Sequence, residues 1–158
     1  MDYLYEKILR PHYFRQDPEK AHNAALKHLA MLAKFGPVVR AMERRNMIVP
    51  GAKPVEAFGL KFANRVGLAA GFDKHADVWP ACGAFGFGHA EIGTITQHAQ
   101  SGNECVRVFR YPQYEAAVNR YGFPNIGADA AAVKLARGPK KGSRSFPLGV
   151  NIGKSKKT

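Results

Sequence analysis

The chain of 158 residues carries 24 Lys and Arg against 12 Asp and Glu, which gives a formal net charge of +12 at pH 7. Hydrophobic residues make up 46% of the sequence, and this content excludes intrinsic disorder of the whole chain. The length alone predicts one domain with a buried core. The sequence shows no apolar run long enough to predict a membrane-spanning helix and no secretory signal.

Cysteine spacing bears on metal binding and on redox environment. Cys82 and Cys105 do not have the close pairing of zinc ligands, and two cysteines do not make a disulfide framework. We therefore predict no metal site, and a reducing compartment fits best.

The C-terminal part of the sequence is strongly basic and contains no acidic residue after Asp129. Its basic residues are Lys134, Arg137, Lys140, Lys141, Arg144, Lys154, Lys156 and Lys157. Such a tract can meet phosphates on nucleic acid or on anionic lipid. A solvated loop is the favoured interpretation, because neither an RNA-binding aromatic signature nor a recognition-helix pattern accompanies the charge.

The first elements in chain order are helical. Residues 3–14 mix apolar, aromatic and basic side chains, which suits a membrane interface, although packing onto a neighbouring domain is favoured on the residues alone. Asp-Pro-Glu at 17–19 predicts the start of a helix that continues to Ala33. Phe-Gly-Pro at 35–37 predicts its end, with the glycine in a left-handed cap, and a second short helix is expected over 38–45.

A second structural unit begins after the Gly- and Pro-containing linker at 50–54. A short hairpin is expected around 58–62, followed by a buried strand at 66–70, a helix at 73–82 and another buried strand at 90–93. Gly83, Gly86 and Gly88 are expected to break that helix. Strand, helix and strand in this order predict a parallel pair.

The remaining pattern predicts an insertion and one more strand of the sheet. Residues 106–109 and 116–118 are expected to pair as a hairpin over the sheet. The alanine-rich run at 128–136 predicts a helix, residues 138–145 a polar loop, and residues 148–152 a third apolar strand.

Each of the three buried strands is followed by, or ends in, a polar side chain. Lys74 follows the first, Thr94 ends the second, and Asn151 lies in the third. Ligands of parallel α/β folds bind at the carboxyl ends of the strands, so these residues predict a common site, which the polar and aromatic segment 119–123 can cover. A glycine turn with a surface lysine is the plainer interpretation of Lys74, and spacing alone does not exclude it.

Several motifs in this order resemble dihydroorotate dehydrogenases. They are Ala-Ala-Gly-Phe-Asp-Lys at 69–74, Glu-Ile-Gly-Thr at 91–94, Gly-Asn at 102–103, Arg-Val-Phe-Arg at 107–110, Asn-Arg-Tyr-Gly-Phe at 119–123 and Gly-Val-Asn-Ile-Gly-Lys at 149–154. The segment Asp-Pro-Glu-Lys-Ala-His at 17–22 is similar to the helical extension of the membrane-associated, quinone-using class (class 2).

The resemblance implies an α/β fold, the N-terminal part of a (β/α)8 TIM barrel with about three parallel strands after a small helical extension. It divides the chain into a membrane- and quinone-associated extension at 1–49 and an incomplete FMN-binding barrel at 50–158. It also implies a flavoprotein oxidoreductase that oxidises dihydroorotate to orotate in de novo pyrimidine (UMP) biosynthesis, with a quinone as acceptor.

The resemblance assigns roles to particular residues. FMN contacts are expected from Ala70, Gly71, Phe72, Asp73, Lys74, Thr94 and Asn151. Substrate contacts are expected from Lys74, Asn119, Arg120, Tyr121, Gly122 and Phe123. Arg110 is expected in the wall of a quinone tunnel; His22 is a candidate for the same site, and a packed helix histidine explains it equally well. Lys74 is expected to pair with the substrate or the reduced flavin, and Asn119 to hydrogen-bond the pyrimidine edge.

The resemblance also sets expectations about what is missing. A (β/α)8 barrel needs about 250 residues, so the chain is expected to be an N-terminal portion that is unstable and inactive alone. None of Ser101, Ser143, Ser145 and Ser155 lies in the family's catalytic-base loop. Peripheral association with the cytoplasmic side of the cell inner membrane is expected, or with the mitochondrial inner membrane if the source is eukaryotic.

Two alternatives remain. The first is a noncatalytic basic module built on a partial barrel, which binds nucleic acid or anionic lipid through residues 134–157. The leading interpretation requires no nucleic acid, because acids outside this sequence can balance its charge. The second is a related flavin barrel that acts on another pyrimidine or uses a soluble acceptor.

Overall fold

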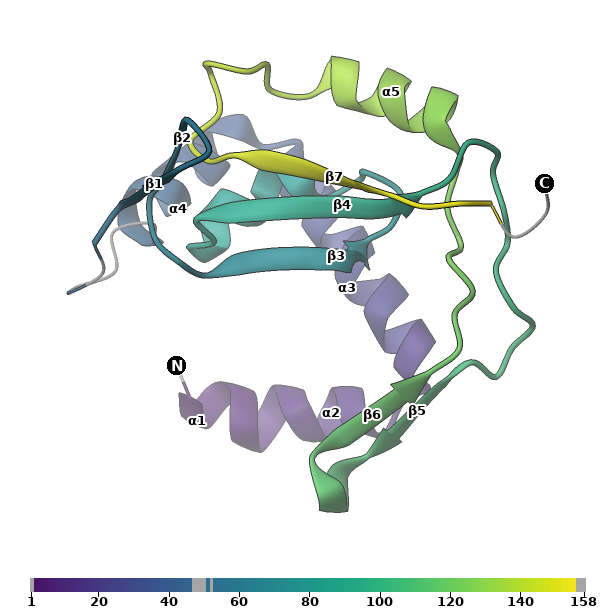
Figure 1. Ribbon diagram of the computed structural model, residues 1–158. Helices are drawn as coiled ribbons and strands as arrows, with labels where there is room; N and C mark the ends of the chain where they lie inside the picture. The colour runs from purple at the N-terminus through teal and green to yellow at the C-terminus, as the bar shows by residue number, and fades with distance from the viewer. Residues whose placement is uncertain (1, 47–50, 52, 156–158) are drawn as a thin grey trace.

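The computed structural model describes residues 2–46, 51 and 53–155 and contains a helical N-terminal part followed by a parallel sheet (Figure 1). The expected domain boundary between residues 49 and 50 lies outside the described residues, as do Lys156 and Lys157 of the basic tract. The first fourteen residues hold α1 (Asp2–Leu4), the π-helical turn η1 (Tyr5–Leu9) and α2 (Arg10–Phe14). Among the described helices, none is both long and apolar enough to cross a membrane.

Several of the first residues do not pack against the described part of the chain. Tyr3, Leu4 and Ile8 are 76%, 55% and 55% exposed. Large apolar side chains gathered on one exposed segment are typical of a surface that meets a partner or a membrane.

The helix predicted from residue 17 is confirmed as α3 (Pro18–Ala33). The carboxylate of Asp17 accepts hydrogen bonds from the backbone amides of Glu19 and Lys20, at 3.0 and 2.9 Å. Because the first amides of a helix have no partner within it, this cap fixes where α3 begins. The left-handed cap expected at Gly36 is wrong, since that glycine instead begins α4 (Gly36–Asn46).

A three-stranded parallel sheet forms the centre of the second part of the chain. Its strands are β3 (Gly67–Asp73), β4 (His89–Ile95) and β7 (Leu148–Ile152), in the order β3-β4-β7. Neighbouring strands follow one another along the chain, with helical segments between them, which is the pattern of a (β/α) barrel. The predicted parallel pairing is confirmed.

The helix expected over 73–82 is wrong. Strand β3 continues to Asp73, and a 3-10 helix, η2 (Trp79–Phe85), follows after a turn. Pro80 has no amide hydrogen and suits only the first turn of a helix, so a helix cannot run through it without losing a hydrogen bond. Gly83 lies inside η2, and the helix ends at Gly86, where φ is 84°.

The core lies between η2, the sheet and α5 (Ala128–Arg137). Its buried members are Ala76, Trp79, Cys82, Ala90, Ile92 and Phe146. Helix α4 packs against η2, and the side-chain amide of Asn46 donates to the carbonyl of Ala84 at 2.6 Å. The helical N-terminal part is therefore attached to the outside of the sheet unit.

Two hairpins complete the fold. Strands β1 (Val55–Ala57) and β2 (Leu60–Phe62) form the predicted antiparallel hairpin before the sheet. The predicted insertion forms a separate hairpin of β5 (Val108–Tyr111) and β6 (Ala116–Asn119), joined through the 3-10 turn η3 (Pro112–Tyr114). Figure 1 shows this second hairpin away from the parallel sheet, on the side where α2 lies.

Candidate functional site

A cavity of about 430 Å³ lies at the carboxyl ends of β3 and β4, under the segment that follows β6. Its volume falls within the range of small-molecule sites. It is lined by Ala70, Gly71, Lys74, Gly93, Thr94, Asn103, Asn119, Arg120, Tyr121, Gly122, Phe123 and Pro124. The structure thus brings together most of the residues that the sequence analysis selected for cofactor and substrate.

The rim of the cavity continues onto β7 through Asn151. The hydroxyl of Thr94 donates to the side-chain oxygen of Asn151 at 2.6 Å. Gly93 has a φ of +112°, and a Cβ atom there would come within 2.5 Å of the Asn151 carbonyl oxygen. Lys74, Thr94 and Asn151 therefore lie at one edge of the sheet, as the strand pattern predicted.

The floor beside Lys74 is built from backbone. Gly71 has a φ of +101°, a conformation that side chains rarely allow, and a Cβ atom built there meets no described atom within 4 Å. This part of the backbone is open to the close approach of a flat ligand.

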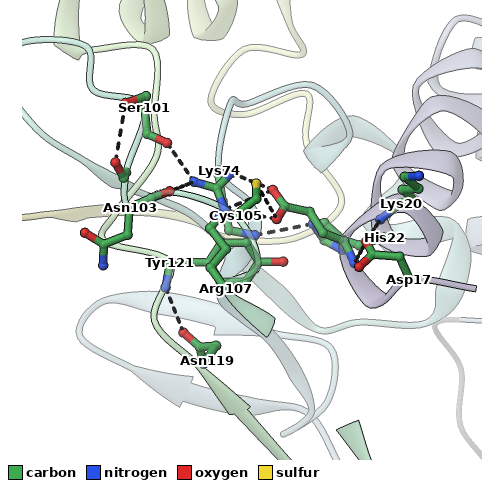
Figure 2. A network of polar contacts seen from close by, with 12 residues as sticks. Asp17, Lys20, His22, Lys74, Ser101, Asn103, Cys105, Arg107, Asn119 and Tyr121 are labelled. Atoms are coloured by element: carbon green, nitrogen blue, oxygen red, sulfur yellow. Dashed lines mark hydrogen bonds and ion pairs between the residues drawn. The ribbon is translucent and has the colours of Figure 1, made fainter. Parts of the chain in front are cut away.

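Lys74 is a half-buried cation whose charge is not paired. Its Nζ lies 4.4 Å from the centroid of the Tyr121 ring and 3.4 Å from Nε2 of His22 (Figure 2). Among the described residues, no carboxylate forms an ion pair with it. Burial lowers the pKa of Lys74, because the low-dielectric surroundings disfavour the charged form. An anionic ligand would relieve this cost.

The segment that covers the cavity is held in place by hydrogen bonds from Asn103 and Asn125. The amide of Asn103 donates to the carbonyl of Tyr121 at 2.9 Å, and its side-chain amide donates to the carbonyl of Arg120 at 2.7 Å. Asn125 is buried, and its side chain hydrogen-bonds the Thr96 amide, the Thr96 hydroxyl and the Gly127 amide. The cover is therefore attached to the end of β4.

Two residues expected to contact FMN direct their side chains elsewhere. The Asp73 carboxylate is buried and accepts from the amides of Asp77, Val78 and Trp79, at 2.8 to 2.9 Å. The Phe72 ring packs edge-on against the ring of His22, with the two centroids 5.2 Å apart. At both positions the backbone is what remains for a cofactor.

The two quinone-site candidates lie in different places. Arg110 lines a second cavity, of about 380 Å³, together with Phe14, Val106, Val108 and other residues of β5 and of the turn between α2 and α3. Its guanidinium donates to the Tyr13 carbonyl at 3.0 Å and lies 4.8 Å from the centre of the Phe14 ring. His22 is not in the lining of that cavity; it lies between Phe72 and Lys74. Burial, followed by the charge of Lys74, lowers the pKa of His22.

Sequence patterns alone indicate no individual role in the site for Glu19, Arg107 or Asn125. Glu19 and Arg107 form an ion pair between α3 and the segment before β5, with nitrogen-oxygen distances that include 3.0 and 3.1 Å. Both residues lie in motifs that carry the resemblance, at 17–22 and at 107–110. Membership of these motifs is the sequence signal that could have pointed to them. Asn125 directly follows the 119–123 motif and Pro124, and no pattern there indicated burial.

A larger cavity, of about 530 Å³, lies at the opposite end of the sheet. Asn64, Val66 and Phe87 line it, and they precede β3 and β4 in the chain. Since parallel barrels bind their ligands at the carboxyl ends of the strands, this cavity is not the favoured site.

The basic tract is partly engaged within the chain. Lys134 forms an ion pair with Asp77 at the surface. Arg144 lies over the ring of Trp79, 5.9 Å from its centre.

The fold and the cavity define a class: an α/β protein that contains the N-terminal part of a parallel (β/α)8 barrel, with a ligand site at the carboxyl ends of its strands. A family model described as dihydroorotate dehydrogenase matches residues 53–158. The chain belongs to the dihydroorotate dehydrogenase family.

Similar proteins agree with this assignment. The chain is 46% identical to a dihydroorotate dehydrogenase (quinone) of Gloeobacter violaceus, with 96% of this chain and 42% of the relative covered. It is 44% identical to one of Acidithiobacillus ferrooxidans, with 96% and 41% covered. A crystal structure of DHODH in complex with ferulenol from Eimeria tenella matches with a TM-score of 0.70 at 35% identity, over 90% of this chain and 37% of that one.

The chain therefore spans about two fifths of the length of the curated relatives that it matches. The matches give no support to the alternative of a noncatalytic basic binding module.

Proposed function

We propose that the protein carrying this chain is a quinone-dependent dihydroorotate dehydrogenase that oxidises dihydroorotate to orotate in pyrimidine synthesis. The observation that carries the proposal is the half-buried cation of Lys74, which forms no ion pair with the described residues, in the wall of a cavity at the carboxyl ends of parallel strands. The names of the relatives, which include the word quinone, supply the acceptor.

The residues of the cavity suit FMN. Small residues at positions 70 and 71 leave the backbone open to a flat ring, and Lys74 supplies a cation for negative charge on a reduced flavin. Thr94 and Asn151 present a hydroxyl and an amide at the same rim. When bound, FMN would supply a hydride acceptor for the substrate and a route for its electrons to a quinone.

The covering segment suits the substrate. Asn119 supplies an amide that can hydrogen-bond the edge of a pyrimidine, and the ammonium of Lys74 can pair with the carboxylate of the substrate. Tyr121 and Phe123 line that side of the cavity. We assign binding and orientation of the substrate to these residues, and we assign no general base to this chain.

The cavity beside Arg110 suits a quinone. Phe14, Val106 and Val108 give it apolar walls, and the guanidinium of Arg110 can donate to a quinone oxygen. His22, which does not line this cavity, is assigned to the contact with Lys74. The exposed apolar residues of α1 and η1 fit a peripheral position on the inner membrane, facing the cytoplasm or, in a eukaryote, on the mitochondrial inner membrane.

The test uses protein expressed from the complete reading frame that contains this sequence. The proposal predicts a yellow protein that releases FMN on denaturation and reduces a quinone analogue with dihydroorotate. A pure, folded protein without flavin, or a flavoprotein inactive with dihydroorotate, would show the assignment to be wrong. Loss of vesicle binding on Leu4→Ser/Ile8→Ser substitution, with activity retained in detergent, would support the membrane assignment, and unchanged binding would contradict it.

A further inference from the structure

Arg107 is the most extensively bonded polar side chain near the cavity, although it is not part of the cavity lining. All three of its nitrogens donate. Nε donates to both carboxylate oxygens of Glu19, at 3.1 and 3.0 Å, and Nη2 donates to Oε1 of the same residue. Nη1 donates to the carbonyls of Ser101 and Asn103, at 2.8 and 2.9 Å. A guanidinium bonded on all sides has little freedom left.

The Glu19–Arg107 pair is shielded from solvent. The Arg107 and Glu19 side chains are 12% and 20% exposed. The Arg107 hydrogen bond holds the pKa of Glu19 below its ordinary value, so the carboxylate stays charged near neutrality. This geometry differs from that of the surface pair Glu6–Arg10, in which the side chains are 47% and 42% exposed.

The same guanidinium also lies against Tyr121. The Arg107 Cζ atom is 5.2 Å from the centroid of the Tyr121 ring, and the Lys74 ammonium is 4.4 Å from that centroid (Figure 2). Both distances are within the range of cation–π contact. The carbonyl of Tyr121 is fixed as well, because the amide of Asn103 donates to it at 2.9 Å.

These contacts form one continuous series from α3 to the wall of the cavity. Glu19 holds Arg107, Arg107 holds the ring of Tyr121 and the 101–103 segment, and the ring contacts Lys74. The Lys74 ammonium also lies within hydrogen-bond distance of His22, which belongs to α3 as well. The position of the lysine therefore depends on the helical N-terminal part as well as on the sheet.

We propose that Glu19 and Arg107 are positioning residues for Lys74: through the ring of Tyr121 they hold its ammonium at the cavity wall, so that α3 forms part of the substrate site. The proposal rests on the function proposed above. It assigns Glu19 and Arg107 no contact with substrate or flavin, and it predicts that removing either one weakens binding of the anionic ligand only while Lys74 is present.

The test measures the dissociation constant of orotate from the absorbance change of the bound flavin in the full-length holoenzyme. Glu19→Gln and Tyr121→Leu are each expected to raise that constant about fivefold to tenfold, the size of one cation–π or charged contact. Glu6→Gln, which removes the exposed carboxylate of the same helical part, is the matched control.

A double-mutant cycle separates positioning from a general structural effect. In a Lys74→Met background, with the protein reconstituted with FMN where it has lost it, Glu19→Gln is expected to change the orotate constant by less than about twofold. An effect of equal size in both backgrounds, or no effect in either, would overturn the proposal. Arg107→Met completes the series if it folds, but the result does not depend on it.

A second readout requires no flavin. The rate of acetylation of Lys74, followed by mass spectrometry, is expected to rise at least about threefold in Glu19→Gln and Tyr121→Leu, because the ammonium loses the contacts that hold and stabilise it. The exposed Lys61 serves as the internal reference. If the wild-type protein binds no flavin or orotate, the proposed function fails, while unchanged Lys74 acetylation in these variants would refute the positioning role separately.

Discussion

The hydroxyl of Thr94 donates to the side-chain oxygen of Asn151 at 2.6 Å and so joins the ends of two neighbouring parallel strands. The amide nitrogen of Asn151 has no hydrogen-bond partner among the described residues and remains available to a ligand. The bond orients this donor, since an Asn with its oxygen engaged presents its nitrogen in a fixed direction.

Thr94→Val keeps the shape of the side chain and removes this hydrogen bond. We expect the dissociation constant of FMN to rise about fivefold to tenfold, which corresponds to about 1 kcal/mol. Flavin fluorescence during titration of the apoprotein measures it. Ser101→Ala, which removes an exposed hydroxyl, is the control, and a Thr94→Val protein with the wild-type constant would contradict the role of the bond.

Asp73 and Asp77 are a matched pair of carboxylates with different expected effects on stability. Asp73→Ala leaves three backbone amides without their acceptor, two of these bonds being fully buried, and is expected to cost about 3 kcal/mol of unfolding free energy. Asp77→Ala removes a surface ion pair with Lys134 and is expected to cost less than about 1 kcal/mol. Urea unfolding measures both, and equal losses would disprove the capping role of Asp73.

The structure separates the two cysteines by reactivity. Burial raises the pKa of the Cys82 thiol to about 12, whereas Cys105 is exposed. Because the thiolate is the reactive form, Cys82 is expected to be inert at pH 8 in the folded protein. A disulfide reagent should modify Cys105 in the native state and both thiols in denaturant, and Cys105→Ser should abolish the native reaction. Rapid labelling of Cys82 in the folded protein would contradict this.

His22 predicts a dependence of stability on pH. Its folded pKa is below the value of about 6.5 for an unfolded histidine, so the unfolded state binds more protons between these two values. The contribution of neutral His22 to the free energy of unfolding is therefore complete at pH values above the pKa of His22 in the unfolded chain. It is lost as the pH falls through the pKa of His22 in the folded protein. His22→Gln should flatten the decline in unfolding free energy between pH 7 and pH 5, and a variant that keeps the wild-type decline would contradict this.

The elements that sequence patterns predicted well are those fixed by neighbouring residues. Helix α3 follows from a cap, a proline and an early acid within three positions, all of which act locally. The three strands of the sheet follow from short apolar runs bounded by glycine or polar residues. The 3-10 helix after β3 was missed because its start depends on the Asp73 carboxylate, which draws the amides of residues 77–79 around itself.

The residues of the candidate site also divide into those that sequence patterns predict and those that they do not. Lys74, Thr94 and Asn151 could be grouped beforehand, since strand ends of a parallel sheet meet at one edge. The contact of Glu19 with Arg107 spans 88 positions in the chain and carries no periodic signal. Such a pair is found only when the helical part and the segment before β5 are placed together in space.

The central claim is that Lys74 holds the anionic ligands of a flavin site. Its most direct test compares wild type with Lys74→Met in two measured quantities, the FMN content of the purified full-length protein and the dissociation constant of orotate. We predict that Lys74→Met either loses FMN or binds orotate at least about tenfold more weakly, as expected for the loss of a charged hydrogen bond. A Lys74→Met protein with wild-type flavin content and wild-type orotate affinity would contradict the account.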